Sequence, residues 1–362
     1  MSDLLRLSAR PTEAEIDAWH AVVTDAHAHD TPAIPPPGRV ETAGELTVPT
    51  PHSRCVRLAV PHPDSARGYA AVASLRLFDD GPRRTAAAVE QLAVRPGLRR
   101  RGLGTRLWRE LRGVLAEERR TSVSAEIETG GEGEHFAGAL GFTCALPLVR
   151  YVQRVADESA EPRLPDGYRF AEWTGTVPAA HAGPFAVVRE GAMADMPLGE
   201  IEGGPDRWDA ERVTALQSSV GARGGEILTV AALAPDGTFA AYTEVVLRSP
   251  DGIRARQYDT AVSPAHRGLR LGHTVKARML ELLRERWPAV REIVTTVADD
   301  NGPMRAVNKL LGYRPERSVG VYQLRLPSDP FRVTPGPSGT PGPSGTPGPS
   351  GTMGGTDTRS GA

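Results

Sequence analysis

The chain has few cysteines, no long apolar run and almost no net charge. Its 362 residues include only Cys55 and Cys144, which follow no metal-ligand spacing. The sequence therefore favours neither a disulfide framework nor a zinc site, and we expect two buried thiols and no bound metal. No stretch approaches the roughly 18 apolar residues of a membrane helix, and a basic-then-apolar secretion signal is absent. These absences predict a cytoplasmic protein that does not bind membranes.

The charge balance argues against a nucleic-acid partner. The chain carries 43 basic and 44 acidic residues, a net charge of −1. Lysine is nearly absent, because Lys276 and Lys309 are the only two. Together with the abundant alanine, glycine and proline, this indicates a GC-rich coding bias, so the arginine content alone is no sign of function.

One short pattern is present twice. V-R-P-G-L-R-R-R-G-L-G runs over 94–104 and V-S-P-A-H-R-G-L-R-L-G over 262–272, and L-G-F at 140–142 recurs as L-G-Y at 311–313. Two copies in one order indicate a duplicated domain, and the chain is long enough for two cores. We predict an N-terminal domain at 1–157, a polar linker at 158–165 and a C-terminal domain at 166–330.

The last residues have a different composition. Glycine falls at every third position from 336 to 354, within three copies of T-P-G-P-S-G. The run is too short for a collagen helix and adds nothing to a core, so we expect 331–362 to be disordered.

Apolar periodicity and turn residues predict the same order of elements in both halves. Thr12 and Glu15 have the spacing of a capping box that starts the first helix. In the N-terminal half we expect strands at 54–60, 69–78, 85–94, 121–127 and 147–155, with helices after Gly104 and at 135–140. In the C-terminal half we expect strands at 166–172, 227–233, 240–247, 254–262, 292–297 and 318–324, with helices at 179–194, 205–219, 271–286 and 302–311.

Each copy of the pattern leaves a strand, passes through a glycine turn and enters an amphipathic helix. Such a turn presents free backbone N–H groups to an anion, and the helix dipole favours negative charge there. It could also be no more than a tight connection. No G-x-G-x-x-G followed by an acidic residue and no G-x-x-x-x-G-K-[ST] is present, which excludes the common dinucleotide and nucleoside-triphosphate sites.

The arrangement resembles the GNAT superfamily of acyl-CoA N-acyltransferases, whose signature is V-x-P-x-x-R-x-x-G-x-G/A followed by a small helix that ends in L-G-F. The matching residues are Val94, Pro96, Arg99, Gly102, Gly104 and Leu140-Gly141-Phe142, and then Val262, Pro264, Arg267, Gly272 and Leu311-Gly312-Tyr313.

The resemblance implies an α+β fold of two tandem GNAT domains, each with a mixed, mainly antiparallel sheet that is splayed where the pantetheine arm of coenzyme A inserts. It implies acetyl-CoA as cofactor, with the pyrophosphate on the amides of 100–105 or 268–273 and the thioester carbonyl near the preceding strand. The cofactor-binding residues so implied are Leu92, Val94, Arg99, Arg100, Arg101, Gly102, Leu103, Gly104, Thr105, Thr260, Val262, Arg267, Gly268, Leu269, Arg270, Leu271, Gly272, His273, Asn301 and Asn308.

The two copies depart from the family pattern in opposite ways. Arg270 replaces a glycine of the second loop. It either adds a charged contact to the cofactor or disrupts the row of backbone amides, the cradle, that is expected to bind the pyrophosphate. Asn301 fits the family asparagine that contacts the cofactor arm, and Asn308 stands where many members have the tyrosine that protonates the departing thiolate. The equivalent first-copy positions are Gly130 and Ala137. His266 and His273 flank the second loop and suit a phosphate contact.

Acyl transfer to an amine needs a base that takes the amine's proton. In the first copy the best candidate is Glu90, four residues before Val94, although it could simply pair with an arginine. In the second copy the candidates are Tyr258, Asp259 and Glu244, for which structural roles are equally reasonable. Asn301 and the polar strand around Asp259 lead us to favour the second copy for catalysis, while the first could still bind acyl-CoA.

The leading hypothesis is an acetyl-CoA-dependent N-acetyltransferase that acts on the primary amine of a small molecule in a ternary complex. A segment at 195–204 is expected to cover the acceptor pocket. One alternative is a non-catalytic acyl-CoA-binding or regulatory protein, and another is mycothiol-synthase-like chemistry. The oligomeric state and the acceptor are left open.

Overall fold

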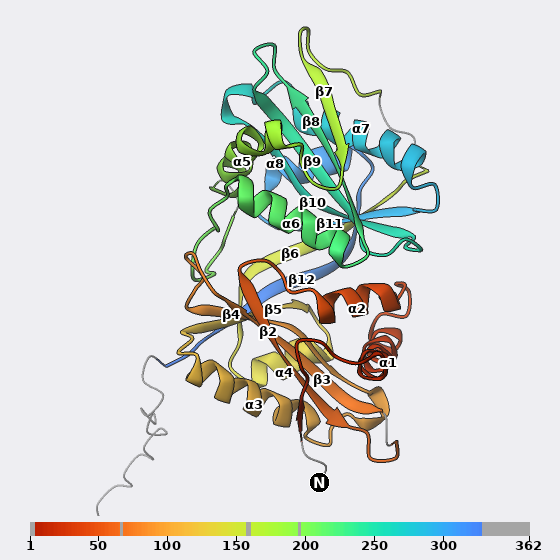
Figure 1. The fold of residues 1–362 in the computed structure, drawn as a ribbon, viewed down its shortest axis with the longest axis vertical. Helices are drawn as coiled ribbons and strands as arrows, with labels where there is room; N and C mark the ends of the chain where they lie inside the picture. The colour runs from red at the N-terminus through yellow and green to blue at the C-terminus, as the bar shows by residue number, and fades with distance from the viewer. Residues whose placement is uncertain (1–3, 66–67, 157–160, 195–196, 328–362) are drawn as a thin grey trace, which may run out of the picture. The chain divides into compact units, whose positions relative to one another are not determined.

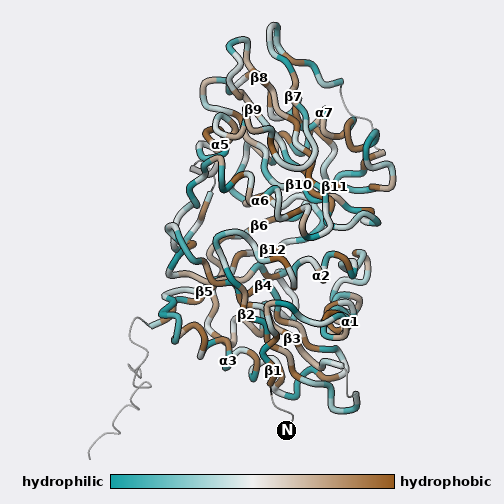
Figure 2. The backbone as a smooth tube through the Cα atoms, in the orientation of Figure 1, coloured by the Kyte–Doolittle hydropathy of each residue, from teal (hydrophilic) through white to brown (hydrophobic). Residues whose placement is uncertain are grey.

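The computed structural model describes residues 4–65, 68–156, 161–194 and 197–327. The predicted disordered tail at 331–362, and the linker up to residue 160, lie outside these ranges. Within them, hydrophobic residues recur along the strands and helices, and hydrophilic ones gather in the connections (Figure 2).

The described chain forms eight α-helices and twelve strands (Figure 1). The first half consists of β1 (Leu5–Arg6), α1 (Glu13–Asp30), α2 (Arg39–Thr47), β2 (Ser53–Pro61), β3 (Tyr69–Phe78), β4 (Ala86–Val94), α3 (Leu103–Glu117), β5 (Ser122–Glu128), α4 (Glu132–Ala139) and β6 (Thr143–Arg154). The second half consists of β7 (Arg169–Thr174), α5 (Ala179–Ala194), α6 (Ala210–Ala222), β8 (Glu226–Leu233), β9 (Phe239–Leu247), β10 (Arg254–Val262), α7 (Leu271–Arg286), β11 (Glu292–Ala298), α8 (Gly302–Leu310) and β12 (Arg314–Arg325).

The sequence predicted most of these elements. Both hydrogen bonds of the predicted capping box of α1 are formed. The Thr12 side chain accepts from the N–H of Glu15, and the Glu15 side chain accepts from the N–H of Thr12. Helix α2 was missed, since it follows a proline-rich stretch and is only nine residues long. The prediction of two buried cysteines was wrong: both thiols are free, but Cys55 is only half-buried and Cys144 is exposed.

All twelve strands belong to one sheet, in the order β1-β2-β3-β4-β5-β12-β6-β11-β10-β9-β8-β7. Among the pairings of the described strands, only β4 with β5 and β10 with β11 are parallel. The expected α+β fold with a mixed, mainly antiparallel sheet is therefore confirmed, and the two halves share that sheet.

The halves exchange their last strands. β6 pairs with β11 of the second half, β12 pairs with β5 of the first half, and the two exchanged strands pair with each other in the middle of the sheet (Figure 1). Tyr151 and Val155 accordingly lie in the core of the second half, and Tyr322 lies in the core of the first. Each half thus needs the other to complete its sheet and its core.

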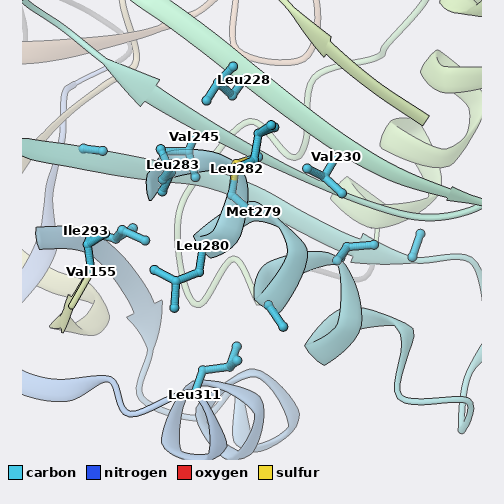
Figure 3. Packing of buried hydrophobic residues seen from close by; sticks show 14 of the residues in the cluster. Val155, Leu228, Val230, Val245, Met279, Leu280, Leu282, Leu283, Ile293 and Leu311 are labelled. Atoms are coloured by element: carbon cyan, nitrogen blue, oxygen red, sulfur yellow. The ribbon is translucent and has the colours of Figure 1, made fainter. Parts of the chain in front are cut away.

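Helices pack on both faces of the sheet in each half. In the second half, α7 places Met279, Leu280, Leu282 and Leu283 against strand residues such as Val245 and Ile293 (Figure 3). In the first half, α3 packs in the same way through Leu107, Leu111 and Leu115. α1 packs against the opposite face of the sheet in the first half. α5 packs against the opposite face of the sheet in the second half. No helix in the part of the chain that the model describes is long and apolar enough to cross a membrane.

Candidate functional site

The site in the first half begins where β4 separates from β5. The two strands pair only from Ala86 to Ala88, and the remaining edge of β4 has no partner strand. Against β3, the register shifts between Gln91 and Val89, which makes Glu90 the extra residue of a β-bulge. A bulge redirects a side chain and ends regular pairing. Glu90 therefore lies at an open sheet edge, just before the glycine loop.

The loop after β4 leaves a row of backbone donors unused. Arg100 and Gly102 have left-handed backbones, with φ of 61° and 78°, and α3 starts at Leu103. Within the described chain, the amides of residues 100–105 donate no hydrogen bond. A Cβ on Gly104 would come within 3.3 Å of the Phe136 ring, so this position suits glycine. The free amides at a helix N-terminus fit the pyrophosphate of coenzyme A.

Arg99 joins three elements around this loop. Its guanidinium donates to Asp30 at the end of α1 at 2.7 Å and to Glu132 at the start of α4 at 3.0 Å, and its Nε donates to the Val94 carbonyl. The side chain thus has protein partners on both sides. We assign Arg99 the role of holding the loop in place, and its contact with a cofactor phosphate stays a prediction.

A pocket of about 1030 Å³ extends from this loop along one face of the sheet. The first half contributes the β4 edge with Leu92 and Val94, the loop, α2 and the start of α4. The second half contributes Arg248, Arg254 and Arg256. No residue of the second-copy loop lines this pocket, and neither does any described residue of the 195–204 segment. In the described part of this segment the Glu200 amide donates to Ala145, on the exchanged strand β6, and the predicted cover over an acceptor pocket stays a prediction.

Two glutamates of the pocket lie near one another, on β4 and α2. Glu90 is paired with Arg76 at 3.1 Å, and Glu45 with Arg248 at 3.1 Å. The Glu45 side chain is half exposed. Partial desolvation by its neighbours, together with the charges of Glu41 and Glu90, raises its pKa against the opposing effect of Arg248. A carboxyl with a raised pKa is a better base near neutral pH than an ordinary one. Glu45 is therefore a second base candidate, which the sequence analysis missed together with α2.

Cys55 lies next to Glu90, with its sulfur 3.7 Å from the carboxylate. Burial, and then the charge of Glu90, raise the pKa of this thiol to about 11. The thiolate is the reactive form of cysteine, so this environment disfavours a nucleophilic role for Cys55.

The second-copy loop has the same backbone but different surroundings. Gly268 and Arg270 have left-handed φ values of 81° and 57°, so arginine occupies the position of Gly102. His266 is hydrogen-bonded to Tyr168 at 2.8 Å, and Thr274 donates to the Arg163 carbonyl at 3.3 Å. Protein groups before β7 thus contact both ends of this loop.

His273, the other predicted phosphate ligand, lies in the first turn of α7. Burial, followed by the charge of Arg270, lowers the pKa of His273. Both effects favour the uncharged ring, which weakens its attraction for an anion.

The predicted carboxylates of the second half are held by Arg189 of α5. Its guanidinium donates to Glu244 and Asp259, each at 2.5 Å, and stacks on Trp208. Glu244 is fully buried and also accepts from Gln217. Carboxylates paired in this way are anchors of the core rather than free bases. Arg189 was missed by the sequence analysis, although a lone arginine in the apolar stretch of α5 was a visible signal.

Tyr258 stands where Glu90 stands in the first copy. It belongs to a bulge of β10, between Gln257 and Thr260, and its side chain lies beside Arg248 in a small cavity between the halves. Thr260, also predicted near the cofactor, is hydrogen-bonded to Thr243 at 2.7 Å. The equivalent residues of the two copies thus share backbone positions but face different surroundings.

The two predicted asparagines have protein partners. Asn301 caps α8 by accepting from the N–H of Met304 at 3.2 Å. Asn308 is fully buried and accepts from the ammonium of Lys276 at 2.7 Å. These hydrogen bonds neither support nor contradict the predicted contacts of Asn301 and Asn308 with the cofactor. Across the residues described, no group of three or more His, Cys, Asp or Glu side chains is placed to hold a metal ion.

Comparison with known families identifies the class of protein. Residues 48–142 and 188–313, together more than half of the chain, match the model of the acetyltransferase (GNAT) family. The chain therefore belongs to the GNAT acetyltransferase family and contains two GNAT regions. Members of this family are usually enzymes and typically use acyl-CoA.

Solved structures share the fold of this chain. The chain is similar to a tandem GNAT protein from the clavulanic acid biosynthesis pathway, at 26% identity and a TM-score of 0.77 over 91% of this chain and 100% of that one. A GCN5-related N-acetyltransferase from Sphaerobacter thermophilus is similar in fold, with 14% identity and a TM-score of 0.64 over 89% of this chain and 95% of that one. No curated protein matches the chain.

Proposed function

We propose that the chain is an acyl-CoA-dependent N-acyltransferase, with acetyl-CoA as its acyl donor, and that catalysis takes place in the first half. The observation that carries this proposal is the continuous pocket from the free amides of 100–105 to Glu90 and Glu45. The surroundings of Glu244 and Asp259 support the same choice, because both are paired with the buried Arg189 and neither lines this pocket, whereas Glu45 and Glu90 do.

The residues of the first half have distinct parts in this proposal. The amides of 100–105 hold the pyrophosphate, and the unpaired edge of β4 at Leu92 and Val94 polarises the acyl carbonyl. Acyl-CoA, when bound, supplies an activated thioester carbon and a thiolate leaving group. Glu45 takes a proton from the acceptor ammonium so that the amine lone pair can attack, and Glu90 holds the ammonium in place.

The acceptor in this proposal is a primary amine of a small molecule. α2 and the β9–β10 connection both line the pocket, and a concave site of this kind suits a compact ligand better than a protein chain. The similar tandem GNAT protein supports a small-molecule acceptor, since it comes from the clavulanic acid biosynthesis pathway.

A matched pair of variants tests the assignment to the first half. We expect purified wild-type protein to release free thiol from acetyl-CoA in the presence of a panel of primary amines. Gly104→Glu places a bulky anion in the cradle, so we expect it to abolish this release, whereas Gly272→Glu at the equivalent position retains it. Loss in Gly272→Glu alone would move catalysis to the second half, and thermal unfolding of both variants checks their folding.

Tight acetyl-CoA binding without thiol release on any amine would instead support the binding-protein alternative. Calorimetric titration of acetyl-CoA into wild-type protein and into both variants shows which half binds it in that case.

A further inference from the structure

Arg256 of β10 lines the pocket and has no partner for its charge. Its side chain is partly exposed to the pocket, and within the described residues it forms neither a hydrogen bond nor an ion pair. Guanidinium groups in protein interiors normally have carboxylate or carbonyl partners, because an uncompensated buried charge is costly. This arginine therefore presents unused donors to whatever occupies the pocket.

Four other guanidinium groups that line the pocket are paired. Arg248 contacts Glu41 at 2.7 Å, and Arg317 contacts Glu128 at 2.9 Å. Arg254 contacts Glu292 at 2.8 Å, and Arg150 is paired with Glu126. Burial, and then repulsion by Arg248, lower the pKa of Arg256, as expected for a cation without a direct counterion. Glu41 and Glu126, whose charges act on Arg256, are already paired with other arginines, so Arg256 has no direct counterion among the described residues.

Arg256 lies on the side of the pocket away from the cofactor loop. Five strand steps separate β4, which leads into that loop, from β10. The sheet opens between β4 and β5, which pair only over three residues, so residues of β4 and β10 line one pocket. Glu41 and Arg248 are near enough to affect the Arg256 charge, and Glu41 and Glu90 in turn affect Glu45. The unpaired guanidinium thus faces the acceptor region rather than the phosphate cradle.

We propose that Arg256 binds an anionic group of the acceptor, a carboxylate or a phosphate, so that the substrate is a small amine that also carries an anion. The inference rests on the proposed function, because it names the substrate class of the same site. A planar guanidinium binds either group through two parallel hydrogen bonds. In this proposal the second half binds the anionic group of the acceptor, whereas acyl transfer takes place in the first half.

The test compares acceptors that differ only in the anion. Glycine is paired with glycinamide, lysine with lysinamide, and O-phosphoethanolamine with ethanolamine, and kcat/KM is measured for each in wild type and in Arg256→Met. Hydrogen bonds to a charged group are worth about a 10- to 100-fold preference. We expect wild type to prefer the anionic member of the carboxylate or the phosphate pairs by this factor, and Arg256→Met to lose the preference. Because both members are compared in each variant, differences in amine pKa cancel.

Two further variants serve as controls. Arg256→Lys keeps a positive charge without the planar fork, so we expect it to retain part of the preference. Arg305→Gln removes an exposed guanidinium outside the pocket, paired with Asp299 at 3.0 Å, and should leave the preference unchanged. An equal preference in wild type and Arg256→Met would overturn the inference, because differences in amine pKa cancel in this comparison of the two proteins.

Binding separates this inference from the proposed function. The same acceptor pairs are titrated by calorimetry without acyl donor. If no amine is acetylated, the proposed transfer activity fails, but a preference for the anionic ligand that disappears in Arg256→Met still supports the anion site. Equal affinities for both members of every pair in wild type would refute it.

Discussion

Lys276 marks a difference in polarity between the two cores. Its position corresponds to Trp108 in the first half, which packs edge-on against Phe142 with 5.3 Å between ring centres. In the second half the ammonium of Lys276 lies 4.5 Å from the ring centre of Tyr313 and donates to Asn308. An aromatic pair in one copy is thus replaced by a buried cation and its amide partner in the other.

Burial lowers the pKa of Lys276 to about 7. Below pH 7 the lysine is protonated in both the folded and the unfolded chain, so the cost of burying its charge is complete. Between pH 7 and the unfolded value near 10.5, only the unfolded chain keeps the proton, and folding stability rises with pH. The second half therefore carries a source of pH-dependent stability that the first half lacks at this position.

The variant Lys276→Met removes this titration. We expect its free energy of unfolding, relative to wild type, to fall by about 2 to 3 kcal/mol between pH 6 and pH 9, because wild type gains stability over that interval and the variant does not. Urea unfolding of both proteins at the two pH values measures the difference. A gap that is independent of pH would show that Lys276 does not titrate in this range.

Helix α2 decides the geometry of the proposed base. It packs so closely on the second half that a Cβ on Gly44 would lie 2.4 Å from the Arg223 carbonyl. Arg223 also donates to the Val48 carbonyl at the end of the helix at 3.0 Å. These contacts hold Glu41 and Glu45, one turn apart, against Arg248. The second half thus helps to position a base of the first.

Replacing Glu45 tests its part in proton transfer. Because a base must be deprotonated to act, and because its pKa is raised, we expect wild-type kcat/KM to fall as the pH drops through that pKa. Glu45→Gln should lose about 100-fold or more in kcat and also lose this acidic limb. Glu41→Gln removes a like charge that raises the pKa of Glu45, so it should move the limb to lower pH. An acidic limb retained in Glu45→Gln but lost in Glu90→Gln would assign the base to Glu90.

The exchanged strands make the folding of each half depend on the other. β12 supplies the partner of β5 and contributes Tyr322 to the first core, while β6 does the same for β11 and the second core. A half expressed alone would expose an unpaired strand edge and an open core, which favours aggregation. The tandem chain is in this sense one folding unit.

Co-expression of separate halves tests this dependence. We expect fragments 1–157 and 161–327 to be insoluble when expressed singly, and to form a soluble 1:1 complex when expressed together. Size-exclusion chromatography with light scattering measures the complex. A soluble, cooperatively unfolding 1–157 fragment would contradict the expectation.

The duplication, the order of elements, the glycine loops and the family were all readable from the chain, because they depend on local periodicity and on turn residues. The capping box of α1 and the limits of β10 and α7 are examples. The partners of charged side chains were not readable in this way. Glu90 pairs with Arg76 of the neighbouring strand, and Glu244 and Asp259 pair with Arg189 of α5, each through packing between separate elements.

The same distinction applies to the choice of the catalytic half, because the motif residues favour the second copy, whereas the pocket favours the first. Motif residues such as Asn301 can be recognised in the sequence, and they show which residue types of the family pattern each copy contains. Whether a group faces a pocket depends on contacts between residues far apart in sequence, such as Arg248 with Glu45 across 203 positions. Local pattern defined the fold and the family, whereas long-range packing placed the first loop beside Glu45 and Glu90 in one pocket and left Arg256 without a direct counterion among the described residues.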